Sequence, residues 1–138
     1  MTSAQCLQYL VATARQSGLS LSKTAQMRLL YLADLRAVRH GCKTTTGIAW
    51  ERADHGPFSR SVQYLAKNVE LPEAEDCWQA HARAVLEAYA RTSHEDLGTL
   101  CKGSAPMRKA ASRGDLLDLE ATSPNDLTAS VTAPTPSA

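Results

Sequence analysis

Four cysteines and four histidines are the residues of this sequence best suited to binding a metal ion or acting as a nucleophile with its base. Cys77 and His81 are one helical turn apart, and His40 precedes Cys42 by two residues. Neither spacing matches a standard zinc motif, and no CxxC is present. We favour a structural interpretation, with Cys77 and His81 packing inward, because single cysteines often serve as small core residues. The sequence therefore predicts no metal site.

A nucleophile paired with a base is the next possibility. Cys42 or Ser59 could be paired with His55. Neither candidate is accompanied by a glycine-flanked nucleophile turn or an oxyanion-hole signature. The sequence also has no Gly-rich phosphate loop and no grouped pair of carboxylates. These patterns favour a protein that is not an enzyme, and they predict no cofactor.

Asp34 falls in the middle of the apolar arc of a helix predicted over residues 22–39. A buried carboxylate is costly unless it meets hydrogen-bond donors. We expect these donors to be either the Arg52 side chain or the backbone N–H groups near Gly56-Pro57. One interpretation is a clamp of Asp34, Gly56 and Pro57 that fixes the irregular segment onto the helix. The other is an acid catalyst or a metal ligand, and we favour the clamp because other acidic residues nearby are not grouped.

Three arginines of the same helix, Arg28, Arg36 and Arg39, fall opposite its apolar arc. Such a stripe could face nucleic acid, or it could be an ordinary solvated helix face. The chain has a net charge of only +1, whereas nucleic-acid-binding domains are usually strongly basic. We therefore favour the solvated face and do not expect a nucleic-acid partner.

The elements that must position these residues are mostly helices. The chain has 138 residues, the size of one domain, and its low aromatic content of 5% favours aliphatic helix stripes over aromatic-rich strands. We predict a mainly α fold of about five to six helices in a domain over residues 1–119. Its helices are expected over 4–17, 22–39, 57–67 and 72–91, with a short one after Ser93 and a last one from Ser104 to Gly114. An extended or β-hairpin segment is expected near 43–55.

Residues 120–138 are small, polar and Pro-rich, and we predict a disordered C-terminal tail there because they cannot bury enough apolar surface. No signal peptide is recognisable, and no stretch approaches the roughly 20 apolar residues of a membrane span. We therefore expect a cytoplasmic protein with free thiols and no membrane partner.

Two blocks of the sequence resemble the Panacea domain, also called the SocA-like antitoxin domain. The run from Lys23 to Asp34 is similar to the "K-L-x-K-L-L-Y-L-A-D" helix of that family, and the run from His55 to Ser59 is similar to its "hGPfS" turn. Gly41, Gly47 and Trp50 lie between them at matching positions. The resemblance covers roughly residues 5–115. In a third block the chain departs from the family, with Cys101, Lys102 and Met107 where Thr, His and Trp are common.

The resemblance implies an antitoxin-like module that neutralises a toxic protein by direct contact, or delivers it to a protease. The alternatives are a phage or prophage counter-defence protein that binds a host immune component, and a nucleic-acid-binding helical domain. Trp50 and Phe58 could be core residues or anchors for a partner. The partner-binding residues that we predict are Trp50, Arg52, His55, Phe58 and Arg60.

Overall fold

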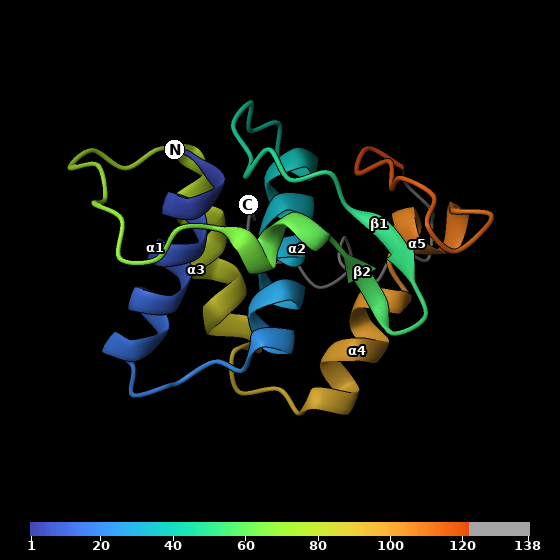
Figure 1. The fold of residues 1–138 in the computed structure, drawn as a ribbon, viewed down its shortest axis with the longest axis horizontal. Coiled ribbons are helices and arrows are strands. Elements are labelled where there is room, and N and C mark those ends of the chain that lie inside the picture. The colour runs from blue at the N-terminus through green and yellow to red at the C-terminus, as the bar shows by residue number, and fades with distance from the viewer. Residues whose placement is uncertain (122–138) are drawn as a thin grey trace.

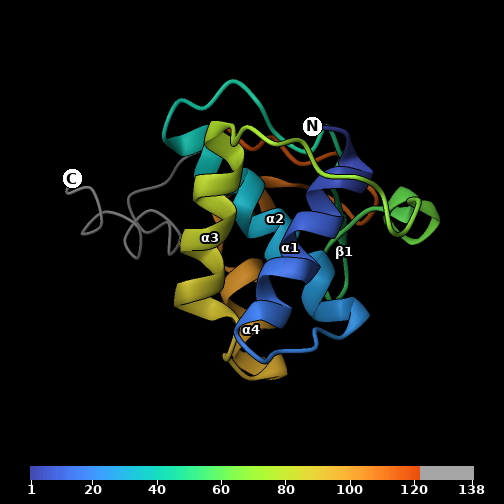
Figure 2. The same ribbon diagram turned by 90° about the vertical axis from the view of Figure 1, so that its left-hand side faces the viewer.

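The long helix α2 (Lys23–Arg39) is the centre of the fold. The structure, a computed structural model, describes residues 1–121. Residues 28–35 of α2 are all buried, so neighbours enclose this part of the helix on every side. Helices α1 (Ser3–Gln16) and α3 (Cys77–Tyr89) pack on one side of it, and α4 (His94–Lys102) and a β-hairpin pack on the other (Figures 1 and 2).

Polar caps set where the helices begin. The Ser22 hydroxyl accepts a hydrogen bond from the backbone of Ala25, which starts α2 as predicted. Thr2 caps α1. Asp76 and Gln79 form a capping box that starts α3, so the helix predicted from Pro72 begins too early. We predicted that Cys77 and His81 of α3 pack inward. The buried residues of α3 are instead Trp78, Gln79, Ala82, Val85 and Leu86.

The hairpin consists of β1 (Glu51–Ala53) and β2 (Gly56–Phe58), paired antiparallel with Glu51 opposite Phe58. The extended segment predicted near 43–55 contains only the first of these strands. The second strand occupies the start of the helix predicted from Pro57. Proline lacks a backbone N–H and is tolerated both on an edge strand and in the first turn of a helix, so the residue type alone does not decide between them. The 3₁₀ helix η1 (Arg60–Tyr64) follows β2 within the span of that predicted helix, and its Val62 is buried.

The C-terminal part of the described chain returns to the hairpin. It follows α4 and the short helix α5 (Ala105–Lys109), which ends before the predicted stop at Gly114. The Arg52 backbone donates to the Asp115 carbonyl (2.9 Å) and accepts from Gly114 (2.7 Å), and Leu117 donates to the Trp50 carbonyl (2.8 Å). Strand β1 therefore has hydrogen-bonded neighbours along both of its edges.

The predicted fold class is confirmed: within residues 1–121 the chain forms five α-helices and one short hairpin. The core is mainly aliphatic, with Leu10, Leu29, Leu30, Leu32 and Leu35 fully enclosed. None of the described helices is long and apolar enough to cross a membrane. Of the predicted tail, residues 122–138 lie outside the described residues.

A disulfide joins Cys42, just beyond α2, to Cys77 in the first turn of α3. The expectation of four free thiols is therefore wrong for this pair, whereas Cys6 and Cys101 are free and buried. The fold brings the two Cα atoms to 6.0 Å, a distance that a disulfide spans without strain, although 35 residues separate the two cysteines in the sequence. Disulfides persist mainly in oxidising compartments, so the cytoplasmic location stays a prediction.

Loss of this disulfide should lower stability. Closing a loop of 35 residues stabilises the folded state by roughly 3–4 kcal/mol in the chain-entropy account. We expect the double substitution Cys42→Ser and Cys77→Ser to reduce the free energy of unfolding by an amount of that order, measured by urea denaturation under non-reducing conditions. A reducing agent should produce the same loss in the wild type and none in the variant. Equal stability of the two proteins without reductant would show that the bond does not form.

Candidate functional site

The carboxylate of Asp34 is the most densely bonded group that the described residues bury. Its side chain is 1% exposed, and it accepts four hydrogen bonds. Oδ1 accepts from the Thr46 backbone N–H (2.9 Å) and from Trp78 Nε1 (2.9 Å). Oδ2 accepts from the Thr46 hydroxyl (2.5 Å) and from Trp50 Nε1 (2.9 Å). The carboxylate thereby joins α2 to the loop that precedes the hairpin and to α3.

This arrangement determines what the carboxylate can do. Burial raises the pKa of the Asp34 carboxyl above its usual range, and the hydrogen bonds from Thr46, Trp50 and Trp78 act in the opposite direction by stabilising the carboxylate. Two oxygens have about four acceptor positions between them, and all four are used. Asp34 is therefore placed to hold structure together, with no lone pair left for a substrate or a metal ion.

A clamp at Asp34 was predicted, but its donors were not. Arg52 instead donates to the carbonyl of Ala110 (2.6 Å), and Gly56 and Pro57 make no hydrogen bond to Asp34 among the contacts of residues 1–121. The donors are Thr46 and two tryptophans, which lie on segments that only the fold brings together. A sequence signal did exist, because a buried indole N–H can only donate and so needs an acceptor.

Trp50 is therefore part of the clamp rather than a partner-binding anchor. It is 2% exposed, and its ring meets that of Tyr31 edge to face at 5.7 Å. The other predicted partner-binding residues lie along the hairpin and η1. His55 and Phe58 line a groove beside β2, Arg60 is exposed on η1, and Arg52 lies by a separate hollow near α5.

The arginines of α2 do not form a solvated stripe. Arg28 is 6% exposed and donates to the carbonyls of His55 and His94. Arg36 donates from Nε to His81 Nδ1 (3.1 Å), and Arg39 donates to the carbonyl of Ala121 (2.7 Å). Their predicted role as a solvated face is wrong because α2 is enclosed and each of them reaches a neighbouring segment. These contacts engage the arginines on which the nucleic-acid-binding alternative depended, and that alternative stays a prediction.

The groove beside β2 is lined by more apolar than polar surface. It has a volume of about 300 Å³ and lies between the first half of α2 and the hairpin. Met27, Ala53, Pro57 and Phe58 provide its apolar surface. Its charged residues are Lys23 and Arg28, and the described lining includes no acidic residue. This combination suits an apolar ligand that carries negative charge.

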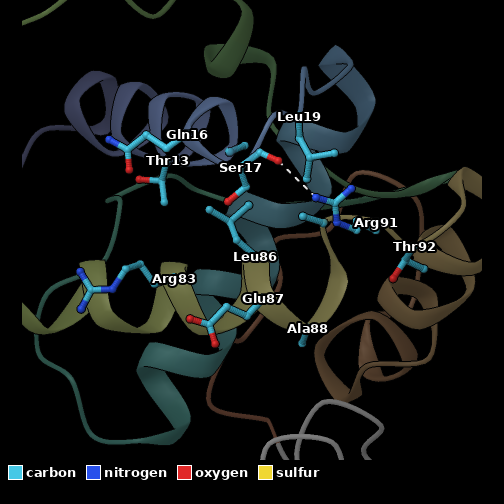
Figure 3. Close-up of a pocket in the computed structure, with 12 residues that line it drawn as sticks. Thr13, Gln16, Ser17, Leu19, Arg83, Leu86, Glu87, Ala88, Arg91 and Thr92 are labelled. Atoms are coloured by element: carbon cyan, nitrogen blue, oxygen red, sulfur yellow. Dashed lines mark hydrogen bonds between the residues drawn. The ribbon is translucent and has the colours of Figure 1, made fainter.

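A larger hollow of about 540 Å³ lies between the ends of α1 and α3 (Figure 3). Arg91 crosses its edge and donates to the carbonyl of Ser17 (3.2 Å). Thr13, Gln16, Arg83 and Glu87 give it a mixed polar lining. Arg83 and Glu87, both on α3, bring opposite charges to its lining.

His81 and His40 lie together at the end of α2, with ring centroids 5.0 Å apart. Because Arg36 donates to Nδ1 of His81, that nitrogen carries no proton in this arrangement. Burial, followed by the charges of His40 and Arg36, lowers the pKa of His81, and burial and Arg36 lower that of His40. Over residues 1–121 no group of three His, Cys, Asp or Glu side chains is placed to hold a metal ion. Of the nucleophile candidates, Cys42 is in the disulfide, and the Ser59 hydroxyl is bonded to Ser61 (2.9 Å).

No protein-family model, curated protein or solved structure matches this chain. The resemblance to the Panacea domain therefore stays a prediction.

Replacing Asp34 should test the clamp. In Asp34→Asn an NH₂ group replaces one carboxylate oxygen, and it cannot accept hydrogen bonds from the donors around it. Asp34→Ala leaves every one of these donors without its acceptor. We expect either change to lower the free energy of unfolding by about 3 kcal/mol, as is typical when a buried charged hydrogen-bond partner is removed. Thermal or urea denaturation would measure it, with Glu87→Gln on the exposed side of α3 as the control. Wild-type stability in both Asp34 variants would contradict the clamp.

The lowered pKa of His81 gives stability a pH dependence. The unfolded chain takes up a proton near pH 6.5, whereas the folded chain takes it up only at lower pH. The contribution of His81 is therefore complete above pH 6.5 and is lost as the pH falls below that value. We expect His81→Gln, in which an amide oxygen can still accept from Arg36, to flatten the fall in stability below pH 6.5. Identical slopes in the wild type and the variant would rule out this contribution.

Proposed function

We propose that this chain is a protein-binding module whose groove beside β2 receives an apolar segment of a protein partner. The observation that carries the proposal is the groove itself: it is apolar, open and framed by the His55–Phe58 segment. An apolar hollow on a small domain suits the anchoring side chain of a partner.

The chemistry of the rest of the described chain favours binding over catalysis. The best-buried carboxylate, Asp34, has its acceptor positions filled, and the thiols of Cys6 and Cys101 are buried. Burial also raises the pKa of each of these two thiols to about 12, so neither is an active nucleophile near neutral pH.

The finer proposal is an antitoxin-like role, in which the partner is a toxic protein that the module neutralises or delivers to a protease. It is supported by the resemblance of the Lys23–Asp34 and His55–Ser59 runs to the Panacea domain. Both runs contribute to the groove, through Lys23, Met27 and Arg28 on one wall and Pro57 and Phe58 on the other. A counter-defence role would use the same groove with a host immune component as partner.

Substitutions in the groove should separate partner binding from folding. We expect Phe58→Gln, alone and with Met27→Gln, to lose the partner that the tagged wild type retains from host lysate in high salt. Removing a buried aromatic anchor commonly costs 2 kcal/mol or more of binding, which is roughly a thirtyfold loss of affinity. The identity of the retained protein, determined by mass spectrometry, would distinguish a toxin from an immune component.

The matched control is Leu116→Gln, which changes an apolar side chain that is 70% exposed and outside the groove lining. It should retain the partner. Circular dichroism and the melting temperature would confirm that the groove variants are folded. Retention of the partner by folded Phe58 and Met27 variants would refute the groove as the binding site.

A further inference from the structure

Arg28 is a buried cation with no carboxylate partner among residues 1–121. The residue is 6% exposed, and its side chain donates from Nη1 to the His94 carbonyl (2.9 Å) and from Nη2 to the His55 carbonyl (3.0 Å). Both acceptors are neutral, and none of the ion pairs formed by the described residues includes Arg28. A buried charge without a counter-ion is costly, and two carbonyls offset that cost only in part. The cation is therefore well placed to gain from an anionic ligand.

Two glycines shape the space around this side chain. A Cβ atom at Gly98 of α4 would lie 3.1 Å from Cζ of Arg28, so the guanidinium group rests closely against the α4 backbone. A Cβ atom at Gly56 of β2 would lie 3.9 Å from Nε of Arg28, so a larger side chain there would cover the Nε edge. Gly56 also has φ 131°, which other residues rarely adopt. The Nε–H has no hydrogen-bond partner among the described residues.

Arg28 lines the apolar groove together with Met27, Pro57 and Phe58, and Lys23 adds a second positive charge to the lining. The acidic residues nearest in sequence to the His94 contact, Glu95 and Asp96, are exposed on the first turn of α4. The groove thus combines apolar walls with two cations, and no acidic residue of the described chain lines it.

We propose that this groove binds the C-terminal end of a partner protein, with the terminal carboxylate at Arg28 and an apolar last side chain against Met27 and Phe58. Guanidinium groups bind carboxylates through parallel N–H donors, and the Nε edge of Arg28 offers such a donor. A hollow of about 300 Å³ has room for only a few side chains. A C-terminal carboxylate has residues on one side only, so it needs less room than an internal Asp or Glu, which has residues on both sides. This inference rests on the proposed protein-binding function and adds the chemistry of the bound segment.

The test uses three peptide probes and the ¹⁵N-labelled full chain. The probes are N-acetyl-Leu-Leu with a free carboxylate, its C-terminal amide, and N-acetyl-Leu-Glu-Leu amide, which carries an internal carboxylate. We expect the free acid to shift the NMR signals of the Arg28 Nε–H, Gly56 and Phe58, with a dissociation constant on the order of 1 mM. The amide should bind at least about tenfold more weakly, which is the loss expected for a charged hydrogen bond. The internal-carboxylate peptide should also bind more weakly than the acid.

Variants distinguish the role of Arg28 from its contribution to the fold. Arg28→Gln should weaken binding of the free acid by about tenfold or more. Because that variant also loses contacts to α4 and β2, Lys23→Gln provides a second measurement on an exposed residue, with an expected loss of about threefold. Lys109→Gln, an exposed charge outside the groove lining, should leave binding unchanged.

Three results would overturn the inference. Equal binding of acid and amide would show an apolar groove without carboxylate recognition, and the proposed protein-binding function would survive. Tighter binding of the internal-carboxylate peptide would refute the chain-end assignment, and so would the absence of any shift with the free acid. Failure of the protein-binding function is seen separately, as retention of the partner by the Phe58 and Met27 variants.

Discussion

The carboxylate of Asp34 is the interaction on which most of this structure depends. It is buried in the central helix and accepts hydrogen bonds from Thr46, Trp50 and Trp78. An ionised group at this depth is tolerated only where donors replace the water it has lost. The loop before the hairpin and the first turn of α3 must therefore come to α2, and the position of β1, directly after Trp50, follows from that. The Cys42–Cys77 disulfide ties the same two segments together covalently, next to the donors.

Arginines make the corresponding contacts elsewhere along α2. Arg28 reaches the turn of the hairpin and the start of α4, Arg36 reaches α3 through His81, and Arg39 reaches the last described residue of the chain. Each of these bonds connects α2 to a segment distant in sequence. A long side chain can bury its stem among apolar neighbours while its head finds carbonyls or a ring nitrogen, which is how an enclosed helix accommodates three arginines.

The groove is a consequence of these two sets of contacts. Asp34 fixes Trp50 and so the entry to the hairpin, whereas Arg28 holds the turn at His55. The hairpin consequently stands beside the first half of α2, with Pro57 and Phe58 facing Met27 across a hollow that no described element fills. Binding there would use a surface whose walls are set by buried polar contacts. Such walls lose little conformational entropy on binding, because they are already ordered.

The sequence by itself determined the fold class, most helix starts and the need for a clamp at Asp34. These follow from local chemistry: caps such as Ser22 act on the next turn, and a carboxylate in an apolar arc needs donors wherever it is placed. The tertiary structure alone decided which donors meet Asp34, that Pro57 belongs to a strand, and that Cys42 pairs with Cys77. It also decided that Arg28 is buried beside the groove rather than solvated. Several of these contacts join residues that are 35 or more positions apart in the sequence. The sequence around each such residue is compatible with more than one partner, so only the packing of the folded chain selects the partner.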